Sequence, residues 1–585
     1  MSEMKYQLKP LAETVPEDEF VDREYELELL WNWAQNIKIN MGHSLAILGR
    51  KGIGKTAILT RFYNRLFLEQ EEIVPFYLSL AEYKSAAETG EFTVEKFCQL
   101  YVTTFIKQFI AFQTQDARLA RQEISIERLK ELCTNMGENE LMDQLEMLEA
   151  TYAKKENTFL VPFATGWAKN LTYNRGLKGV VIIDEFQIVD HLYEEEAQRW
   201  TSIKDSFQKQ ADPRWCPMLV SGSAVSLVSK LVFGGLLARR FSRYTLKPLD
   251  QKSTIEYVMK LSRKRGIEVS EAVAQAIYER TGGNPYYVWA ILSSKSLRGN
   301  DLSNLDRFGE ILEYELISQD GDILGFWRNH FSEYAEKINK DRIGMRVLFY
   351  LAKHRGEEAH RNKIAREIGE ADVFKVEGIL KNLHEADLVD QETMSIYRGI
   401  TDPILIEYIT RQYRTEIEDV SLEQYRRDWQ MEYKKLQGKV NNFIGEVAEV
   451  YTKYVMERFD GREVEGERYF GIKGKQVLPR FQSIECRSGV IIQGERIEFD
   501  LIGEHEGGRW LVEVKYWKGG IGVGEVEGFI KKLGKMKGAY EGWLFSRGGF
   551  DAGARALLEE KGLKHSGIRE FNLLARELGL AGLPE

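Results

Sequence analysis

The residues best suited to do chemistry lie in a glycine-rich loop near the N-terminus, Gly49-Arg50-Lys51-Gly52-Ile53-Gly54-Lys55-Thr56. This segment fits the pattern G-x-x-x-x-G-K-[ST], in which backbone N–H groups surround phosphates, the lysine reaches the β- and γ-phosphates and the threonine hydroxyl holds Mg²⁺. The apolar run 44–48 in front of it predicts a buried strand, and 57–63 behind it predicts an amphipathic helix whose N-terminus faces the anion. We therefore predict ATP binding. The predicted nucleotide-binding residues of the loop are Gly49, Lys51, Gly52, Gly54, Lys55 and Thr56.

Two acidic residues follow a second apolar run. The run 179–183 predicts a buried strand, and Asp184 and Glu185 come directly after it. A carboxylate at the end of such a strand can hold Mg²⁺, and an adjacent glutamate can orient and deprotonate the attacking water. The alternative is a pair of acids that caps a surface strand. We predict Thr56 and Asp184 as metal ligands and Glu185 as the catalytic base.

Later segments offer further residues to the same site. The run 217–223 predicts another strand, and Ser221 or Ser223 is placed to contact the γ-phosphate or the water. Arg239 belongs to a group of three arginines and can neutralise transition-state charge, supplied in trans by a neighbouring subunit. Surface salt bridges are the alternative for these arginines. Pro285 follows two glycines that end a helix and is predicted to begin the next one.

A second group of chemically capable residues lies near the C-terminus. The segments 496–503 and 509–517, joined by a short turn, predict a β-hairpin. Strand alternation puts Glu513 and Lys515 on one face, and Asp500 can face the same side from the first strand. Two carboxylates and a lysine at a strand end can bind Mg²⁺ and position a hydroxide for attack on a phosphodiester. A salt bridge within the hairpin is the alternative.

Two features around the hairpin favour the same interpretation. The preceding segment 442–451 predicts a helix that can offer Glu446 as a further ligand. Lysines gather in this region and give it local positive charge, which favours a phosphate-backbone partner, DNA. They are Lys515, Lys518, Lys531, Lys532, Lys535 and Lys537.

Length and composition bound the remaining possibilities. A chain of 585 residues and 67.7 kDa is too long for one core, so roughly three to four domains are expected. The net charge of −9 argues against a wholly basic nucleic-acid coat without excluding a local basic groove. The four cysteines are scattered, so neither a zinc site nor a disulfide framework is predicted. The N-terminus lacks a signal-peptide core and no apolar run approaches the ~20 residues that cross a bilayer, so we expect a cytoplasmic protein without membrane contact.

These patterns predict a multidomain α/β protein. We expect a helix from Phe20 that covers the adenine side of the nucleotide, with an ordinary first helix as the alternative. We also expect a helical insertion at about 91–169, to which the sequence assigns no function. The expected domains are a P-loop parallel-sheet ATPase core at 1–250, a helical lid at 251–335, three short helices with a two-stranded wing at 336–412, a helical connector at 413–436 and a second α/β domain at 437–585.

The order of motifs in the first half resembles the archaeal-type ATPases of the AAA-related, signal-transducing STAND group. The resemblance covers residues from Phe20 to Asn300 and rests on the glycine-rich loop, on Asp184-Glu185, Ser221 and Arg239, and on Gly283-Asn284-Pro285. It implies a doubly wound sheet with a helical lid, in which the Gly-x-Pro segment senses the nucleotide. Such proteins cycle between a closed ADP form and an open ATP form that assembles, which implies a homo-oligomer and a protein trigger.

Residues 341–399 resemble the winged-helix module that members of this group often carry after the lid. The third predicted helix of this module mixes Lys375 and Lys381 with acids such as Glu377, which suits phosphate contact poorly. We therefore expect an adaptor between domains, with DNA reading as the alternative.

The C-terminal pattern resembles the PD-(D/E)xK nuclease fold, particularly its restriction-endonuclease-like branch. The resemblance implies that Asp500 and Glu513 bind Mg²⁺ or Mn²⁺, that Lys515 stabilises the nucleophile or transition state, and that Glu446 assists. Phe499 stands where the name of the motif has proline.

Together the resemblances imply an ATP-regulated, metal-dependent DNA endonuclease, with defence against foreign DNA as its natural use. The alternative is a signalling or scaffold ATPase whose C-terminal domain binds DNA or protein without cleavage.

Overall fold

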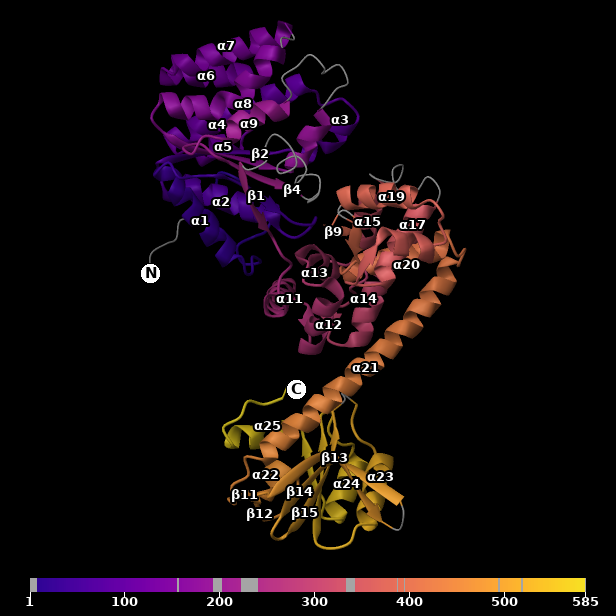
Figure 1. Ribbon diagram of the computed structural model, residues 1–585. Helices are drawn as coiled ribbons and strands as arrows, with labels where there is room; N and C mark the ends of the chain where they lie inside the picture. Colours follow the sequence, from indigo (N-terminus) through magenta and orange to yellow (C-terminus); the bar gives the residue numbers. More distant parts are fainter. Residues whose placement is uncertain are drawn as a thin grey trace, which may run out of the picture. The chain divides into compact units, whose positions relative to one another are not determined.

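The computed structural model describes residues 8–154, 157–192, 203–222, 240–332, 342–386, 388–393, 395–492, 495–516 and 519–583. The chain divides into two compact units, Met1–Arg426 and Arg427–Glu585, each with its own five-stranded sheet (Figure 1). Within these described ranges, no helix combines the length and apolar character needed to span a bilayer.

The first unit is built on a parallel sheet in the order β2-β3-β4-β1-β5. Every residue of β1 and β4 is buried, as expected for strands of a parallel sheet covered on both faces. The strands are β1 (Ser44–Leu48), β2 (Ile73–Ser79), β3 (Lys178–Asp184), β4 (Met218–Gly222) and β5 (Phe241–Thr245). The predicted α/β fold with a P-loop type of parallel sheet is therefore confirmed for this unit. Because the strands are parallel, the carboxyl ends of β1, β3 and β4 meet at one edge.

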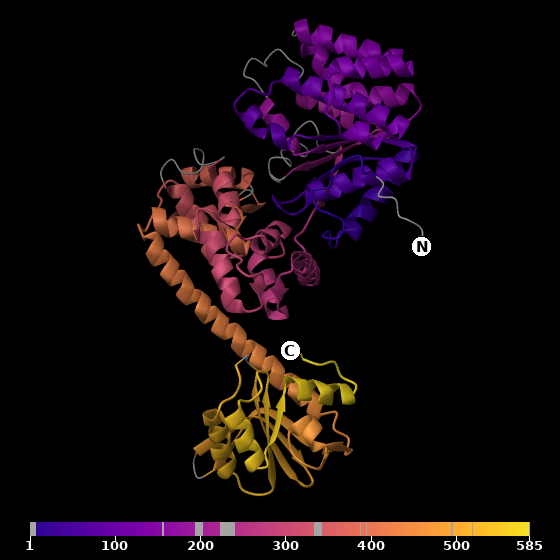
Figure 2. The same ribbon diagram turned by 180° about the vertical axis from the view of Figure 1, so that it is seen from behind.

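Two of the helices within the stretch 91–169, which lies between β2 and β3, cover this sheet. α4 (Val94–Thr114) packs on β2 and α8 (Asn157–Asn174) packs on β3. The other three helices of this stretch pack on α4 and α8, with α6 and α7 at the outer end of the domain (Figures 1 and 2). They are α5 (Ala117–Arg121), α6 (Ile126–Met136) and α7 (Asn139–Lys154). The stretch 91–169, which we expected to be an insertion, thus contributes two helices that cover the sheet and three that pack on those helices and share their apolar core.

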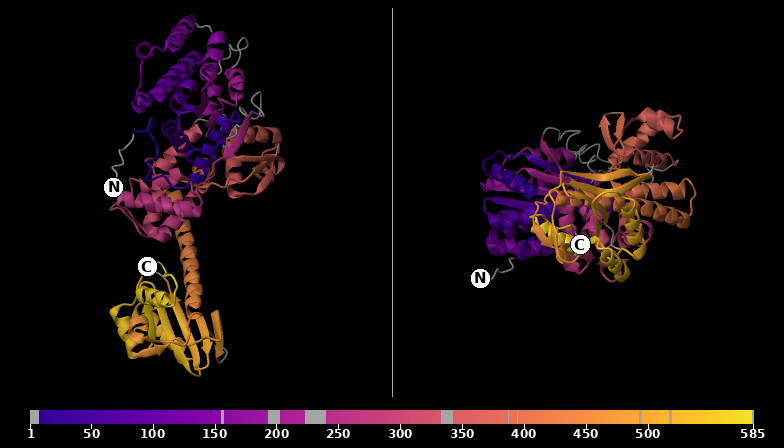
Figure 3. Two further views of the ribbon diagram at one scale, coloured as in Figure 1. Left: turned by 90° about the vertical axis from the view of Figure 1, so that its left-hand side faces the viewer. Right: turned by 90° about the horizontal axis from the view of Figure 1, so that it is seen from below.

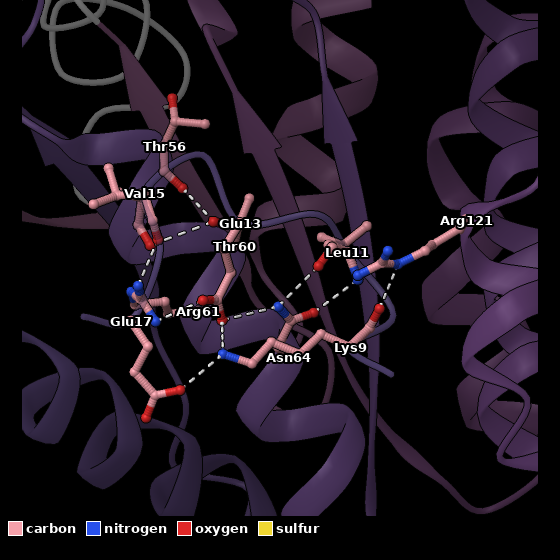
Figure 4. Close-up of polar contacts among 11 residues, drawn as sticks. Lys9, Leu11, Glu13, Val15, Glu17, Thr56, Thr60, Arg61, Asn64 and Arg121 are labelled. Carbon is pink, nitrogen blue, oxygen red and sulfur yellow. Dashed lines mark hydrogen bonds and ion pairs between the residues drawn. The ribbon is translucent and has the colours of Figure 1, made fainter. Parts of the chain in front are cut away.

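The N-terminal segment is anchored to the helix that follows the glycine-rich loop, α2 (Lys55–Glu69) (Figure 4). Arg61 forms an ion pair with Glu13 at 2.6 Å and donates to the carbonyl oxygen of Val15 at 2.6 Å. Asn64 accepts a hydrogen bond from the Leu11 N–H at 2.8 Å and donates to its carbonyl oxygen at 3.1 Å. These contacts hold residues 8–19 against α2.

The first helix of the sheet domain, α1 (Glu24–Lys38), begins later than the expected start at Phe20. Asp22 and Arg23 have φ of 60° and 79°, so the chain turns there before the helix begins. The short elements of this domain are η1 (Ala81–Tyr83), α3 (Lys84–Glu88), η2 (Phe186–Leu192) and α9 (Ile203–Ala211).

A helical region follows the sheet. It contains α11 (Gln251–Arg265), α12 (Glu271–Thr281), α13 (Pro285–Leu292), α14 (Leu305–Ile317) and α15 (Asp322–Ser332), with a small parallel pair of β6 (Glu268–Val269) and β7 (Asp301–Leu302). Pro285 is the first residue of α13, where its missing N–H costs nothing.

Three helices and a three-stranded antiparallel sheet, in the order β8-β10-β9, come next. They are α17 (Ile343–Lys353), β8 (Glu358–His360), α18 (Arg361–Glu367), α19 (Val373–Glu385), β9 (Asp390–Thr393) and β10 (Ile396–Arg398). α20 (Pro403–Glu416) packs on α17. α21 (Leu422–Met456) then runs on through the expected boundary at 436/437.

The second unit has a mixed sheet in the order β13-β14-β15-β16-β17, antiparallel as far as β15 and parallel from there on (Figures 1 and 3). The strands are β13 (Ser483–Ile492), β14 (Glu495–His505), β15 (Gly508–Lys515), β16 (Tyr540–Ser546) and β17 (Lys564–Gly567). The predicted hairpin is present as β14 and β15.

Two separate apolar cores cover this sheet. One core contains residues of α21, α22 (Gly466–Phe470) and α25 (Ile568–Glu577), together with Val512 and Val514 of β15. The other contains residues of α23 (Val523–Gly534) and α24 (Ala552–Glu560), together with Leu511 of β15. A short pair of β11 (Glu463–Glu465) and β12 (Lys475–Val477) completes the unit. The alternation along β15 thus sends its odd-numbered side chains towards α23.

Candidate functional site

The glycine-rich loop connects β1 to α2 and needs glycine at two places. Gly52 and Gly54 have φ of 83° and 100°, in the left-handed region that favours glycine. A Cβ at Gly52 would lie 2.8 Å from the Cβ of Tyr286 on α13, so the loop also needs glycine where α13 approaches it. Gly54 is the residue before α2, whose amino end therefore faces the loop.

The two lysines of the loop have different surroundings. Lys55 is buried, and its Nζ donates to the carbonyl oxygens of Gly49 at 2.6 Å and Arg50 at 3.2 Å. Lys51 is exposed and places its Nζ 5.2 Å from the centre of the Phe326 ring on α15. Lys55 is thus the ammonium group at the centre of the loop, whereas the side chain of Lys51 contacts the helical region.

Asp184 ends β3 and accepts hydrogen bonds from the first turn of α2 and from β4. The Thr56 hydroxyl donates to Asp184 Oδ2 at 2.6 Å, and the buried Ser221 hydroxyl of β4 donates to Asp184 Oδ1. Burial and the neighbouring Glu185 carboxylate raise the pKa of Asp184, while these two hydrogen bonds act in the opposite direction. Mg²⁺ prefers hard oxygen ligands of this kind, so Thr56 and Asp184 fit the metal predicted for them.

Ser221 holds the Asp184 carboxylate. Ser221 is fully buried and donates to Asp184 Oδ1, which the sheet order allows because β4 lies between β1 and β3. The contact with the γ-phosphate or the water that we expected of Ser221 or Ser223 stays a prediction, and Ser223 lies outside the described residues.

Glu185 is held in a strained backbone conformation beside Asp184. Its φ is 58°, a value that is uncommon for a non-glycine residue and that is found at functional sites. Its N–H donates to Asp184 Oδ1 at 3.1 Å, and its side chain accepts from Gln187 Nε2 at 2.5 Å.

An apolar pocket adjoins the loop. Its lining includes Phe20, Ile53, Gly54, Tyr257 and Pro285, and therefore combines the N-terminal segment, the loop, α11 and α13. An apolar slot beside a phosphate-binding loop suits the flat face of a nucleotide base. Phe20 lines this pocket, although it precedes α1, and its place at the adenine side of a nucleotide stays a prediction.

Two predicted residues, one in the ATPase domain and one in the C-terminal domain, cannot be placed. Arg239 lies outside the described residues, as does the side chain of Glu446 on α21. Both remain predictions.

The C-terminal residues Asp500, Glu513 and Lys515 are brought together by β14 and β15. Leu501 pairs with Val512, so Asp500 and Glu513 occupy the next positions of the two antiparallel strands. The Lys515 Nζ lies 3.0 Å from Glu513 Oε2 and 3.9 Å from Asp500 Oδ2. Two carboxylates of adjacent strands are a ligand set that Mg²⁺ accepts, because it keeps several waters and binds through one or two carboxylates.

Burial changes the ionisation of this group. It raises the pKa of Asp500 to about 6, helped by the Glu513 carboxylate and opposed by the hydrogen bond that Asp500 accepts from the Val514 N–H at 2.7 Å. Burial lowers the pKa of Lys515, but the Glu513 and Asp500 carboxylates outweigh it and leave that pKa above its ordinary value. Lys515 is therefore an ammonium group at neutral pH.

The sequence analysis named Lys532 only as one of several lysines of this region, and it did not name Glu449. Lys532 on α23 contacts Glu513 Oε1, and Glu449 on α21 is near enough for its charge to raise the pKa of Asp500. Glu449 is buried and accepts from Arg487 Nε at 2.9 Å. Glu449 lies one helical turn after Glu446, so both residues are on the same face of the helix. This spacing was the signal in the sequence that could have indicated Glu449. Across the part of the chain that is described, no three His, Cys, Asp or Glu side chains gather closely enough to hold a metal ion.

Comparison with known proteins identifies the segment that contains the glycine-rich loop. Residues 20–291 match the model of an ATPase domain found predominantly in Archaea, so this segment is an archaeal-type P-loop ATPase domain. No curated protein sequence matches the chain.

Three solved structures are similar to this chain at low sequence identity. The Walker-type ATPase of Pyrococcus abyssi is 17% identical over 68% of this chain and 99% of its own, with a TM-score of 0.46. The ORC2 protein of Aeropyrum pernix, solved as ADPNP-ADP complexes, is 14% identical over 70% and 98%, with a TM-score of 0.38. The ORC1 protein of the same organism, solved in complex with DNA, is 13% identical over 70% and 97%, with a TM-score of 0.32.

Proposed function

We propose that this chain, whose residues 20–291 are an archaeal-type P-loop ATPase domain, is an ATP-regulated, metal-dependent DNA endonuclease. One observation carries the nuclease part of the proposal. The Lys515 ammonium group lies within 4 Å of both the Asp500 and the Glu513 carboxylates, at 3.9 and 3.0 Å. The convergence of two acids and a lysine at the end of a strand is suited to phosphodiester hydrolysis.

In the ATPase domain we assign each residue of the site a separate role. Lys55 neutralises the β- and γ-phosphates, and Thr56 and Asp184 hold the Mg²⁺ that accompanies the nucleotide. Glu185 orients the attacking water and accepts its proton. Arg239 is the residue that we propose to stabilise the transition state in trans, which makes the active form a homo-oligomer.

In the C-terminal domain, Asp500 and Glu513 hold the metal and Lys515 acts as a cation. Held by these two carboxylates, Mg²⁺ or Mn²⁺ would supply Lewis-acid chemistry and an activated water. The raised pKa of Lys515 keeps its Nζ protonated, so it donates a hydrogen bond to the developing charge on the phosphate and does not take a proton from water. The metal-binding roles of these residues, and the assisting role of Glu446, remain part of the proposal.

The biological use that we propose is defence against foreign DNA, set off by a protein trigger. The support for this use is the architecture, in which an ATPase switch shares a chain with a nuclease-like domain. No residue of either site supports it.

The test is cleavage of plasmid DNA with Mg²⁺ or Mn²⁺, with and without ATP. We expect wild type to cleave, Asp500→Asn to lose cleavage, and Lys55→Ala to lose the response to ATP. Glu504→Gln is the matched control, because Glu504 lies on the same strand and pairs with Arg509 at 3.0 Å at the exposed end of the hairpin. Equal cleavage by wild type and Asp500→Asn would remove the nuclease assignment.

A signalling or scaffold ATPase is the second candidate, and one observation favours it. Among the residues that the structure describes, the C-terminal carboxylates do not reach the three ligands of a self-sufficient metal site. In that case the C-terminal domain binds DNA or protein without cutting it. Binding without cleavage under Mg²⁺, Mn²⁺ and Co²⁺, together with unchanged ATP hydrolysis, would place this candidate first.

A further inference from the structure

Both carboxylate oxygens of Glu513 are already engaged by lysines. Its Oε2 lies 3.0 Å from the Lys515 Nζ, and its Oε1 contacts the Lys532 Nζ. Lys532 also donates to the carbonyl oxygen of Glu498 on β14 at 3.1 Å. The Glu513 side chain is only 3% exposed, so these two ammonium groups neutralise it away from bulk water.

The pairing with Lys532 conflicts with metal binding at Glu513. A divalent cation placed on this carboxylate would lie close to an ammonium group that is bound to the same carboxylate. At such distances the repulsion between like charges in a half-buried site is larger than in water. One of the two lysines must therefore move when the metal binds.

Lys532 is better placed to move than Lys515. The Lys515 side chain is 28% exposed, and its Nζ lies near Asp500 as well as Glu513. The Lys532 side chain is 43% exposed and reaches the site from α23, in its last turn, so its end can turn towards solvent without a change in the sheet. A lysine turned outward beside a metal-bound phosphodiester meets the next anionic group available, a phosphate of the backbone.

We propose that Lys532 is a displaceable counter-ion of the C-terminal site: it pairs with Glu513 when no metal is bound, and it contacts a phosphate of the DNA backbone once the metal takes Glu513. This inference rests on the proposed nuclease function. It makes Lys532 a positioning residue that weakens metal binding in the absence of DNA and strengthens DNA binding in the presence of metal. The full site then assembles only when metal and DNA are both present.

The first experiment measures Mn²⁺ binding to the full chain by calorimetry, without nucleotide or DNA. The heat that disappears in Asp500→Asn defines the C-terminal site. We expect Lys532→Met and Lys532→Gln to bind Mn²⁺ at this site roughly tenfold more tightly than wild type, because a competing cation is removed. Lys532→Arg should stay near wild type. Lys531→Met is the matched control on the same helix and should also stay near wild type.

The second experiment measures binding of duplex DNA in Ca²⁺, by fluorescence anisotropy at several salt concentrations. We expect Lys532→Met to bind more weakly than wild type and to show a salt slope smaller by about one ion. Lys532→Arg should keep both properties.

Each outcome of the two experiments supports or overturns the role proposed for Lys532. Equal Mn²⁺ affinity in Lys532→Met, Lys532→Gln and wild type would overturn the inference while leaving the metal site in place. Tighter Mn²⁺ binding with unchanged DNA binding would overturn the transfer to phosphate. If no variant shows heat that depends on Asp500, the metal site itself fails, and the inference fails with it.

Discussion

Each of the two candidate sites places a lysine close to acidic residues at the end of a strand. The charged side chains have different kinds of partner in the two sites. In the ATPase domain Lys55 donates to carbonyl oxygens of its own loop, and Asp184 accepts from the hydroxyls of Thr56 and Ser221. In the C-terminal domain the ammonium groups of Lys515 and Lys532 lie directly on a carboxylate of Glu513. The buried carboxylate of the first site is thus held by neutral hydroxyls, whereas the buried carboxylate of the second site is held by ammonium groups.

This difference bears on the order of binding. The hydroxyl of Thr56, which holds Asp184 in the first site, is itself an oxygen ligand that Mg²⁺ accepts, so the metal that accompanies the nucleotide fits beside it. A site whose carboxylate is paired with lysines must exchange a cation before it accepts a metal. The comparison therefore predicts a nucleotide site that works by itself and a nuclease site that depends on its ligands arriving together.

The largest expected effect concerns Glu185, and it separates binding from hydrolysis in the first site. Glu185→Gln keeps the size and the hydrogen bonds of the side chain but cannot accept a proton. We expect ATP hydrolysis to fall by about 10²–10⁴-fold with ATP affinity unchanged, measured by phosphate release and by binding of a fluorescent nucleotide. Asp190→Asn, which changes another acid of the segment after β3, is the control. Normal hydrolysis in Glu185→Gln would assign the proton to another group.

A smaller effect is expected for Lys515 in the second site. Lys515→Met removes the cation that lies between Asp500 and Glu513, so we expect cleavage to fall by about 10²–10³-fold. Lys515→Arg should recover part of the activity, because the pKa raised by the two carboxylates indicates that a cation, and not a base, is needed there. ATP hydrolysis should be unaffected in both variants. Full activity of Lys515→Met, measured on the same plasmid substrate, would contradict the role of Lys515 as a cation.

The elements around the first site could be predicted because their signals are continuous in the sequence. The run 44–48 is a buried strand, the residues from Lys55 onwards form a helix, and Pro285 begins α13 as its position after two glycines indicated. The partner of Ser221 could not be predicted, because the order of strands in a sheet is set by packing across the whole domain. The same holds for α4 and α8, whose apolar faces gave no sign that they cover β2 and β3.

The second site shows a different limit. The hairpin and the alternation of Glu513 with Val512 and Val514 could be predicted from a period of two. Lys532 could be predicted only as one of several lysines in the region, because its contact depends on how α23 crosses the sheet. Glu449 was not assigned to the site because the rotation of a helix about its axis is fixed by packing, and here Glu449 is held by Arg487. The assisting role of Glu446 stays a prediction.

Ser221 provides a prediction of intermediate size. Ser221→Ala removes one hydrogen bond to a buried carboxylate, which costs roughly 1.5–3 kcal/mol when the partner is charged. We expect ATP hydrolysis to fall by about ten- to a hundredfold and the Mg²⁺ concentration needed for half-maximal activity to rise. Thr60→Ala, which removes a hydroxyl bonded within α2, is the control for loss of a hydroxyl alone. An unchanged Mg²⁺ requirement would show that Thr56 suffices to position Asp184.

The smallest expected effect tests whether the nucleotide site is linked to the rest of its unit. Arg50, in the glycine-rich loop, forms an ion pair with Asp390 of β9 at 3.0 Å. Both side chains are partly exposed, at 28% and 55%, so the pair is worth little in stability. We expect a double-mutant cycle of Arg50→Ala and Asp390→Ala to give a coupling of about 0.5 kcal/mol in the free energy of unfolding, which decreases as salt is added.

The same cycle measured on ADP affinity is more informative. If the pair links β9 to the nucleotide loop, the two single variants and the double variant should shift ADP affinity by the same small factor, because each breaks the same contact. Lys363→Ala is the control, because it removes an exposed cation from the same module without touching the loop. Independent, additive shifts would show that Arg50 acts on the nucleotide alone, and that the first site is as self-contained as its neutral hydrogen bonds suggest.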